Sequence, residues 1–345
     1  QLQEANQKLR RANEEITKLY EKTRELDNLK SQFFSSVSHE LRTPLALILG
    51  PTERLLQAPE TPDAARRDLD VVARNARALL GHVNNLLDIA KLEAGRMRLD
   101  YATTDLSRLV RFVASHFEVL SEEKRIHLHV EAPDALLAEL DPEKVQRILM
   151  NLVSNAFKFT PAGGRVRVTL RGTPERVLFE VADSGPGIPP DKREAVFERF
   201  RQIEEGATRR FGGTGLGLSI ARELALLQLG SISISDAPEG GALFVVELPR
   251  TAPPNSVVRS AEVTAEFPTD ARHVVEELRD RPRTVVSPLG TVEGALLLVV
   301  EDNPEMNRFI SESLSDQYRI AVAFDGREGL EKAKELRRDL ILTDI

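Results

Sequence analysis

A histidine with an acidic neighbour stands near the start of the chain, in the run SHELRTPL at residues 38–45. In a helix, Thr43 lies one turn from His39 on the same face, and Glu40 stands beside it. A neutral imidazole can attack phosphorus while a neighbouring carboxylate holds the other ring N–H and accepts its proton. Pro44 has no N–H for the carbonyl of Glu40, so the helix should weaken or bend there. Because a lone histidine on a helix is usually a surface residue, this pair alone is weak grounds for a nucleophile.

A second cluster offers groups that suit a magnesium nucleotide. Asn151, Asn155 and Lys158 recur at i, i+4 and i+7, so they share one face of a predicted helix. Side-chain amide oxygens can bind Mg²⁺, and a lysine ammonium suits phosphate oxygens. The sequence therefore predicts a phosphate-facing side on this helix.

Two glycine-containing runs complete the set. Asp183 follows a predicted strand, where its carboxylate can accept from an adenine amino group, and Gly185 and Gly187 let the backbone approach the base. The run FGGTGLGL at 211–218 opens a helix whose free N–H groups favour phosphate. Its candidate nucleotide-binding glycines are Gly213, Gly215 and Gly217. No strand leads into this run and the chain has no Walker A sequence, so a dinucleotide fold and a P-loop are both disfavoured.

The elements before residue 98 are predicted to be long helices. A heptad repeat runs from Leu2 to Val37, and nine of its eleven core positions are apolar, which predicts a parallel coiled coil. A single amphipathic helix packed on a globular domain is the alternative. The helical pattern continues to about Leu56, breaks near Pro59, and resumes to about residue 94. Two such hairpins would make a four-helix bundle.

From about Thr103 the pattern changes to a mixed α/β domain that ends near Pro249. Its predicted helices are Leu106–Lys124, Asp141–Phe157 and Gly215–Leu229, and its predicted strands are His127–Glu131, Arg165–Arg171, Arg176–Ala182, Ser231–Ser235 and Leu243–Leu248. A proline-containing linker is predicted over 250–294.

The last 51 residues alternate short strands and helices, which predicts the first half of a doubly wound parallel sheet. The predicted elements are strand Ala295–Val300, helix Glu305–Ser315, strand Arg319–Ala323, helix Gly326–Leu336 and strand Leu340–Thr343. Glu301 and Asp302 follow the first strand and Asp344 follows the third, so their carboxylates could converge on one Mg²⁺.

Composition sets limits on the class of protein. The net charge of −7 argues against a chain-wide nucleic-acid footprint, and the absence of cysteine excludes disulfides and thiolate metal sites. The longest apolar run, Ala295–Val300, is far below the ~20 residues that span a bilayer. We expect a cytoplasmic fragment without direct nucleic-acid contact, and its parent protein could be a membrane-anchored sensor.

Taken together, the motifs resemble those of bacterial hybrid sensor histidine kinases. The run at 38–45 resembles the H box, 151–160 the N box, 183–188 the G1 box, 197–202 the F box and 212–218 the G2 box, in the family's order. The resemblance covers residues 1–249. It implies a dimeric four-helix bundle followed by a Bergerat-type α/β sandwich that binds ATP. One departure is that Leu229-Gly230 stands where the family usually has a His-Gly-Gly turn.

The resemblance also implies roles for residues. His39 would be the phosphoacceptor, Glu40 the base, and Thr43 a residue that places water for phosphatase chemistry. Asn155 would bind Mg²⁺. The implied ATP-binding residues are Asn151, Asn155, Lys158, Asp183, Gly185, Gly187, Phe200, Gly213, Gly215 and Gly217. The last unit resembles the first half of a receiver domain, with Glu301 and Asp302 for metal and Asp344 as phosphoacceptor.

The predicted organisation follows from these assignments. It is a coiled coil over 1–30, a dimerisation and phosphotransfer hairpin over 31–98, an ATP-binding domain over 103–249, a linker over 250–294 and a truncated receiver domain over 295–345. The predicted activity is ATP-dependent histidine autophosphorylation within a homodimer, with transfer to a receiver aspartate of this chain or of a separate response regulator. Two alternatives remain: an ATP-driven clamp of the gyrase or mismatch-repair type, and a signalling scaffold with a vestigial ATP site.

Overall fold

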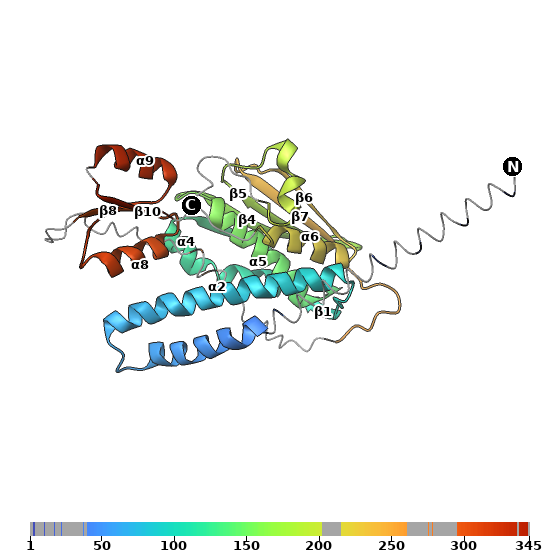
Figure 1. The fold of residues 1–345 in the computed structure, drawn as a ribbon. Helices are drawn as coiled ribbons and strands as arrows, with labels where there is room; N and C mark the ends of the chain where they lie inside the picture. Colours follow the sequence, from blue (N-terminus) through green and yellow to red (C-terminus); the bar gives the residue numbers. More distant parts are fainter. Residues whose placement is uncertain are drawn as a thin grey trace. The chain divides into compact units, whose positions relative to one another are not determined.

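A computed structural model gives the fold (Figure 1). It describes residues 40–201, 215–260, 295–336 and 338–343, together with the isolated positions 3, 10, 17, 22, 37, 275 and 278. The coiled coil predicted over 1–30 lies almost wholly outside these residues. The chain divides into two units, Gln1–Arg279 and Asp280–Ile345, which are described separately.

The first unit begins with a helical hairpin. Residues 40–57 are helical and a short turn leads into helix α2, Asp63–Glu93. Leu45 is 5% exposed because it packs against Ala76 and Val83 of α2. This small apolar seam holds the two helices together.

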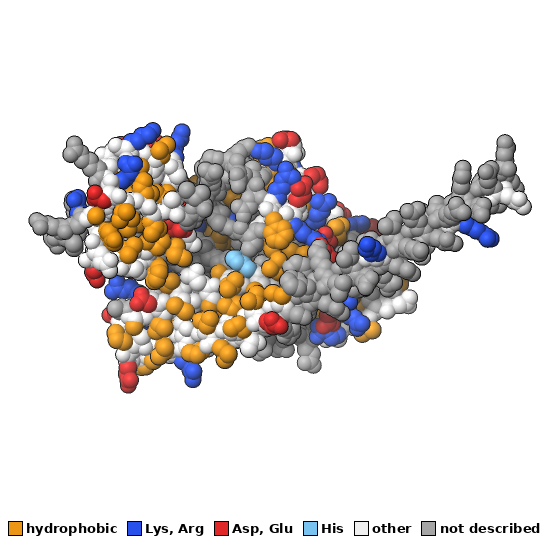
Figure 2. All heavy atoms as spheres, viewed as in Figure 1, with side chains coloured by type: hydrophobic (Ala, Val, Ile, Leu, Met, Phe, Trp, Pro, Cys, Tyr) orange, Lys and Arg blue, Asp and Glu red, His pale blue; other side chains and the backbone are white. Residues whose placement is uncertain are grey.

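The same hairpin leaves many large apolar side chains exposed. Leu41, Ile48 and Leu55 recur every seven residues along the first helix, and Val72 and Leu79 do so along α2. Figure 2 shows apolar side chains gathered over this hairpin. Heptad-spaced residues form one stripe on a helix, so an apolar face remains uncovered among the residues that the structure describes.

An α/β domain follows the hairpin. Its five-stranded sheet has the order β2-β4-β5-β7-β6, with β2 parallel to β4 and the other pairs antiparallel. The strands are β2 (His127–Glu131), β4 (Arg165–Gly172), β5 (Arg176–Asp183), β6 (Ser231–Asp236) and β7 (Ala242–Pro249). The remaining elements are β1 (Ala102–Asp105), α3 (Leu106–Ser115), α4 (Glu118–Lys124), β3 (Leu137–Leu140), α5 (Pro142–Phe159), the short 3₁₀ helices η1 (Pro190–Lys192) and η2 (Ala195–Phe197), and α6 (Gly217–Leu227).

Helices cover one face of this sheet and create the main core. Strand β4 buries Val166, Val168 and Leu170, whereas Arg167 and Arg171 between and beyond them stay more exposed, as the two-residue period of a strand requires. The buried residues of α3, α5, α6 and the sheet form one cluster. The α/β fold predicted for this part is present, and α5 lies at its centre.

One local expectation was wrong. The helix predicted over Leu106–Lys124 is two helices, α3 and α4, with a turn at His116. The ring of Phe117 is fully buried and stacks on Phe157 with a centroid distance of 5.1 Å. Burying this ring against α5 favours the turn over a continuous helix. The short strands β1 and β3, which pair antiparallel, were not predicted.

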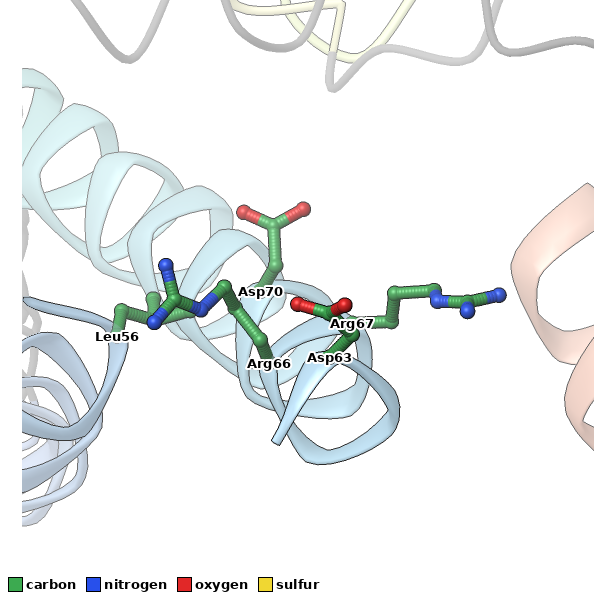
Figure 3. Close-up of a pocket in the computed structure, with 5 residues that line it drawn as sticks. All are labelled: Leu56, Asp63, Arg66, Arg67 and Asp70. Atoms are coloured by element: carbon green, nitrogen blue, oxygen red, sulfur yellow. The ribbon is translucent and has the colours of Figure 1, made fainter. Parts of the chain in front are cut away.

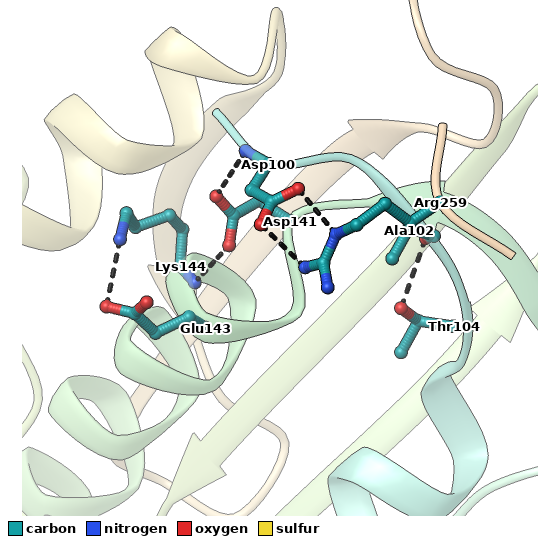
Figure 4. Close-up of polar contacts among 7 residues, drawn as sticks. All are labelled: Asp100, Ala102, Thr104, Asp141, Glu143, Lys144 and Arg259. Atoms are coloured by element: carbon teal, nitrogen blue, oxygen red, sulfur yellow. Dashed lines mark hydrogen bonds and ion pairs between the residues drawn. The ribbon is translucent and has the colours of Figure 1, made fainter. Parts of the chain in front are cut away.

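The chain leaving β7 returns along the entry to the domain. We call residues 250–260 the return segment. Its Arg259 pairs in parallel with Ala102 of β1, and the Arg259 carbonyl accepts from the N–H of Thr103 at 3.1 Å. The Arg259 guanidinium binds the carboxylate of Asp100 at 2.6 and 2.7 Å (Figure 4). The entering and leaving segments are therefore fastened to each other.

Asp141 joins this corner to helix α5. Its carboxylate caps α5 by accepting from the N–H of Lys144 at 3.1 Å, and it also accepts from the N–H of Asp100 at 2.9 Å (Figure 4). The N–H of Asp141 itself donates to the side-chain oxygen of Gln228, just after α6. Asp141 is 3% exposed, so these hydrogen bonds lie away from water.

We expect Asp141→Ala to lower the free energy of unfolding of the α/β domain by about 2 to 3 kcal/mol, because a helix cap and a second buried N–H lose their acceptor. Thermal unfolding of the chain, followed by calorimetry, measures this loss. The control is Glu143→Ala, which removes an exposed contact with Lys144 on the same helix turn and should change little. Equal stability of the two variants would contradict the role assigned to Asp141.

The second unit is a three-stranded parallel sheet with the order β10-β8-β9. Its elements are β8 (Leu296–Val300), α8 (Pro304–Leu314), β9 (Arg319–Ala323), α9 (Gly326–Glu335) and β10 (Leu340–Thr343). Leu297 and Val299 pack in one apolar cluster with Ile310 of α8, and Leu298 packs in another with Ala333 of α9. Alternate strand residues thus face helices on opposite sides, which is the arrangement of a doubly wound sheet. All four residues of β10 are exposed.

Candidate nucleotide and phosphoacceptor site

The H-box run lies on the first helix of the hairpin. Glu40 and Thr43 are both exposed, and the helix continues through Pro44. The Arg42 guanidinium donates to the side-chain oxygen of Asn84 on α2 at 2.8 Å, which ties this run to the second helix. His39 lies outside the described residues, so its position next to Glu40 comes from the sequence alone.

The predicted polar side of α5 is present. Asn151, Asn155 and Lys158 are all half-buried on this helix. The opposite side is apolar and buried, and it includes Val145, Ile148, Leu149, Leu152, Val153 and Ala156. Burial of that side fixes the rotation of α5, so the three polar side chains point away from the core.

Helix α6 begins against the same polar side. A Cβ atom added at Gly217 would lie 3.2 Å from the side-chain oxygen of Asn151. Leu216, the N-cap residue of α6, makes no side-chain cap hydrogen bond, so no cap from this residue occupies the N–H groups of the first turn. The structure therefore brings Asn151 and Gly217 together, 66 residues apart in the sequence.

Asp183 lies at the end of β5 and is 5% exposed. The N–H groups of Gly185 and Ala242 donate to its Oδ1 at 2.8 and 3.2 Å. Burial raises the pKa of the Asp183 carboxyl, the two N–H groups oppose that rise, and the charge of Glu239 adds to it. Both hydrogen bonds to this carboxylate within the described residues end at Oδ1, so Oδ2 is left for a donor from a ligand.

The backbone around Asp183 is packed so closely that two neighbouring positions require glycine. A Cβ at Gly185 would lie 2.8 Å from the carbonyl oxygen of Phe159, and one at Gly241 would lie 2.2 Å from Asp183 Oδ1. Gly187, with φ of +70°, adopts the left-handed conformation that favours glycine. Gly241 was not predicted as a site residue, although the Gly240-Gly241 pair before a strand is a turn signal.

Phe200 and Gly215, which lie on either side of the run 202–214, are joined by a hydrogen bond. The N–H of Phe200 donates to the carbonyl of Gly215 at 3.1 Å, and both residues have positive φ, +61° and +67°. The Phe200 side chain is 67% exposed. Gly213 lies within the run and outside the described residues.

Polar contacts connect α2 with the α/β domain inside the first unit. Arg147 of α5 forms an ion pair with Asp88 and donates to the side-chain oxygen of Asn85 at 2.8 Å. Arg199 forms an ion pair with Glu93 near the end of α2. The F-box run is therefore in direct contact with the hairpin.

A surface hollow occurs at the hairpin turn (Figure 3). It is lined by Leu56, Asp63, Arg66, Arg67 and Asp70. At 1.5 Å per residue, the 16 residues of helix between Glu40 and Leu56 span about 24 Å. The hollow is therefore remote from the H-box run.

In the second unit, Glu301 is 6% exposed and Asp302 is exposed. The side-chain amide of Asn307 donates to the carbonyls of Glu301 and Ala323 at 3.1 and 3.0 Å, which fixes the end of β8 beside β9. Asp344 lies outside the described residues. Among the residues that are described, no group of three or more histidine and acidic side chains is arranged to hold a metal ion.

Comparison with known proteins agrees with this architecture. Residues 140–252 match the family described as histidine kinase-, DNA gyrase B- and HSP90-like ATPase. The chain thus carries an ATPase domain of this class. Residues 29–95 match the His Kinase A (phospho-acceptor) domain. With both domains in this order, the chain belongs to the histidine kinase family.

Two curated relatives cover nearly the whole chain. Hybrid signal transduction histidine kinase D of Dictyostelium discoideum is 38% identical over 97% of this chain. Sensor histidine kinase TmoS of Ectopseudomonas mendocina is 44% identical over 96% of it. The chain spans only 28% and 35% of the lengths of these relatives.

A solved structure shares the fold. The crystal structure of full-length ShkA in complex with AMPPNP matches 90% of this chain and 86% of its own, with a TM-score of 0.54 and 23% identity. Separately, no helix in the described part of the chain is both long and apolar enough to cross a bilayer.

Proposed function

We propose that this chain is an ATP-dependent protein histidine autokinase that phosphorylates His39. The observation that carries the proposal is the convergence of three predicted clusters on helix α5. The N terminus of α6 meets Asn151, the loop after Asp183 meets the carbonyl of Phe159, and the polar side of α5 lies between them. The match of residues 29–95 to a phosphoacceptor domain supplies the second substrate.

In this proposal each group has a role with ATP. The free oxygen of Asp183 accepts from the exocyclic amine of adenine, and the glycines around it admit the flat base. Gly217 at the start of α6 and Gly215 just before it would present N–H groups to the phosphates. Gly213, which lies outside the described residues, would do the same. Lys158 adds positive charge at the far end of the same side of α5.

The donor set also fits Mg²⁺. Asn155 offers a neutral amide oxygen one turn from Asn151, and it is half-buried on the polar side of α5. Oxygen ligands of this kind suit a hard cation that keeps several waters. When bound, the ion neutralises charge that develops on the phosphates.

The chemical step is an in-line displacement. The imidazole of His39 attacks the γ-phosphorus of ATP, the bond to the β,γ-bridging oxygen breaks, and ADP leaves. Glu40 accepts the proton from the other ring nitrogen. In a separate hydrolytic step, the phosphatase reaction, Thr43 would orient the water that attacks the phosphoryl group and releases inorganic phosphate.

The phosphoryl group then passes to an aspartate of a receiver domain. Asp344 of this chain is one candidate, with Glu301 and Asp302 near its metal, and a separate response regulator is the other. We propose cytoplasmic action without nucleic acid, in a parent protein that could be a membrane-anchored sensor.

We expect a homodimer through the hairpin and the preceding heptad repeat. The exposed stripes of Leu41, Ile48, Leu55, Val72 and Leu79 need a second copy to cover them. Light scattering at micromolar concentration should give twice the chain mass of 38.4 kDa. Ile48→Glu places a charge in the exposed stripe of the first helix and should shift the mass toward the monomer. A monomeric mass for the unaltered chain would refute this proposal.

Incubation with γ-labelled ATP and Mg²⁺ tests the activity. The expected label is lost in acid and stable in base, as for phosphohistidine, and it disappears in His39→Gln. Acid-tolerant, base-labile label that Asp344→Asn abolishes would instead place the phosphate on the receiver half. Nucleotide binding without any label would favour the scaffold alternative. ATP hydrolysis without label would favour the clamp, against which the phosphoacceptor-domain match argues.

A further inference from the structure

The turn between β6 and β7 presses against Asp183. The turn is closed by its own backbone, because Ala237 donates to the carbonyl of Gly241 at 2.8 Å and Gly240 donates to that of Ala237 at 2.9 Å. A Cβ at Gly241 would lie 2.6 Å from the nitrogen of Gly185, in addition to its clash with Asp183. The next residue, Ala242, donates its N–H to Asp183 Oδ1. The placement of this turn therefore decides how the Asp183 carboxylate is held.

An ion pair with Arg167 of β4, two strands away from β7 in the sheet, fastens this turn. Arg167 Nε donates to Glu239 Oε1 at 2.6 Å, and the two side chains are 22% and 13% exposed. Arg167 is in register with Ala182 of β5, and Ala182 is in register with Leu243 of β7. The arginine thus reaches over β5 to a turn beyond it. The small side chain of Ala182 leaves room for this crossing.

Removing Arg167 from this ion pair is costly. Glu239 is mostly buried, and its second oxygen, Oε2, has no hydrogen-bond partner among the described residues. The hydrogen bond from Arg167 lowers the pKa of Glu239, so the carboxylate stays charged. Without Arg167, that charge would be left unpaired close to Asp183.

We propose that Arg167 and Glu239 are positioning residues for nucleotide binding. Their ion pair fixes the turn of residues 237–241, so that the N–H of Ala242 holds Asp183 Oδ1 and leaves Oδ2 for adenine. The proposal rests on the adenine-binding role of Asp183 in the proposed function. Neither residue touches the nucleotide in this arrangement.

The test compares the dissociation constant for ADP, measured by titration calorimetry, across matched variants. Arg167→Gln and Glu239→Gln should each weaken ADP binding about tenfold, which corresponds to about 1.4 kcal/mol. The double exchange Arg167→Glu with Glu239→Arg should recover most of the affinity, because the pair is restored in reverse. In autophosphorylation, the KM for ATP should rise while kcat stays within twofold. Arg176→Gln is the control, since it breaks an exposed pair with Glu247 on the same sheet and should leave ADP affinity unchanged.

Two results separate this inference from the proposed function. If Asp183→Asn abolishes ADP binding while Arg167→Gln and Glu239→Gln bind normally, the ion pair does not position the site and the inference is wrong. If Asp183→Asn binds ADP normally, the adenine contact itself is wrong and the inference falls with it. Loss of affinity in the exchanged double variant, with its unfolding temperature retained, would also overturn the inference.

Discussion

Replacing Asp183 by Asn should weaken ADP binding about 100-fold, since hydrogen bonds to a charged group contribute roughly 1.5 to 3 kcal/mol. The reason lies in the two N–H groups that already donate to Oδ1. They oblige an asparagine to place its oxygen there and its NH₂ toward the base. The exocyclic amine of adenine would then meet a donor instead of an acceptor.

Calorimetric titration of ADP measures this effect, and titration of GDP provides the matched comparison. GDP carries an oxygen where adenine has its amine, so the unaltered protein should bind GDP weakly. Asp183→Asn should reduce the difference in affinity between ADP and GDP. Equal loss of affinity for both nucleotides would indicate a disturbed loop and contradict direct recognition of the base.

The raised pKa of Asp183 also sets a pH dependence. Burial is its main cause, and it places the folded-state pKa above the unfolded value of about 3.9. In the nucleotide-free protein, this carboxyl therefore contributes stability below the unfolded pKa and loses that contribution as pH rises through the folded-state pKa. ADP affinity should follow the opposite course and fall as the carboxylate is protonated. Asp183→Asn should remove that part of the pH dependence.

Replacing Asn155 by Ala should reduce the autophosphorylation rate by about 10²- to 10³-fold, the usual loss when one preorganised charge-stabilising group is removed. The amide oxygen is the proposed Mg²⁺ ligand, and alanine has no donor atom to replace it. Initial rates with γ-labelled ATP at saturating Mg²⁺ measure the loss.

Two further measurements isolate the cause. ADP binding in the presence of a chelator should change little in Asn155→Ala, because the base and ribose do not depend on the ion. The mass of the dimer should also be retained, since the hairpin and α5 use different contacts. An unchanged rate would show that the metal ligand has been misplaced.

Local sequence pattern was sufficient where it determines which side of an element is buried. The i, i+4, i+7 spacing on α5 predicted the polar side correctly. The apolar residues of this helix recur at helical spacing on the opposite side, so only that side can face the core. The strand His127–Glu131 was predicted with its observed bounds. By contrast, the turn before Phe117 depends on a ring contact with Phe157, 40 residues away, which no local periodicity contains.

The turn at Leu229-Gly230, just before β6, is explained by local hydrogen bonds that the sequence alone did not reveal. The N–H of Gly230 donates to the carbonyl of Ala225 and that of Leu229 to Leu226, both at 2.9 Å, which closes α6 with a Schellman motif. Leu229 takes the left-handed position, with φ of +58°, where glycine is preferred. Gly230 is required for another reason, since a Cβ there would lie 2.3 Å from the carbonyl of Glu247.

The remaining site contacts join residues that are distant in sequence. Gly241 meets Asp183 across 58 residues, and Arg167 meets Glu239 across 72. Such pairs depend on sheet order and register, which short strands of similar composition do not specify. The residues of the candidate site could therefore be proposed from the sequence, but the groups that hold them in place could not.

Asp100 and Arg259 hold the two ends of the ATPase domain together. Because residues 100–102 and residue 259 lie side by side, the chain enters and leaves this domain at one corner. A domain whose two ends are adjacent can be inserted between other domains of a longer chain without drawing its own ends apart.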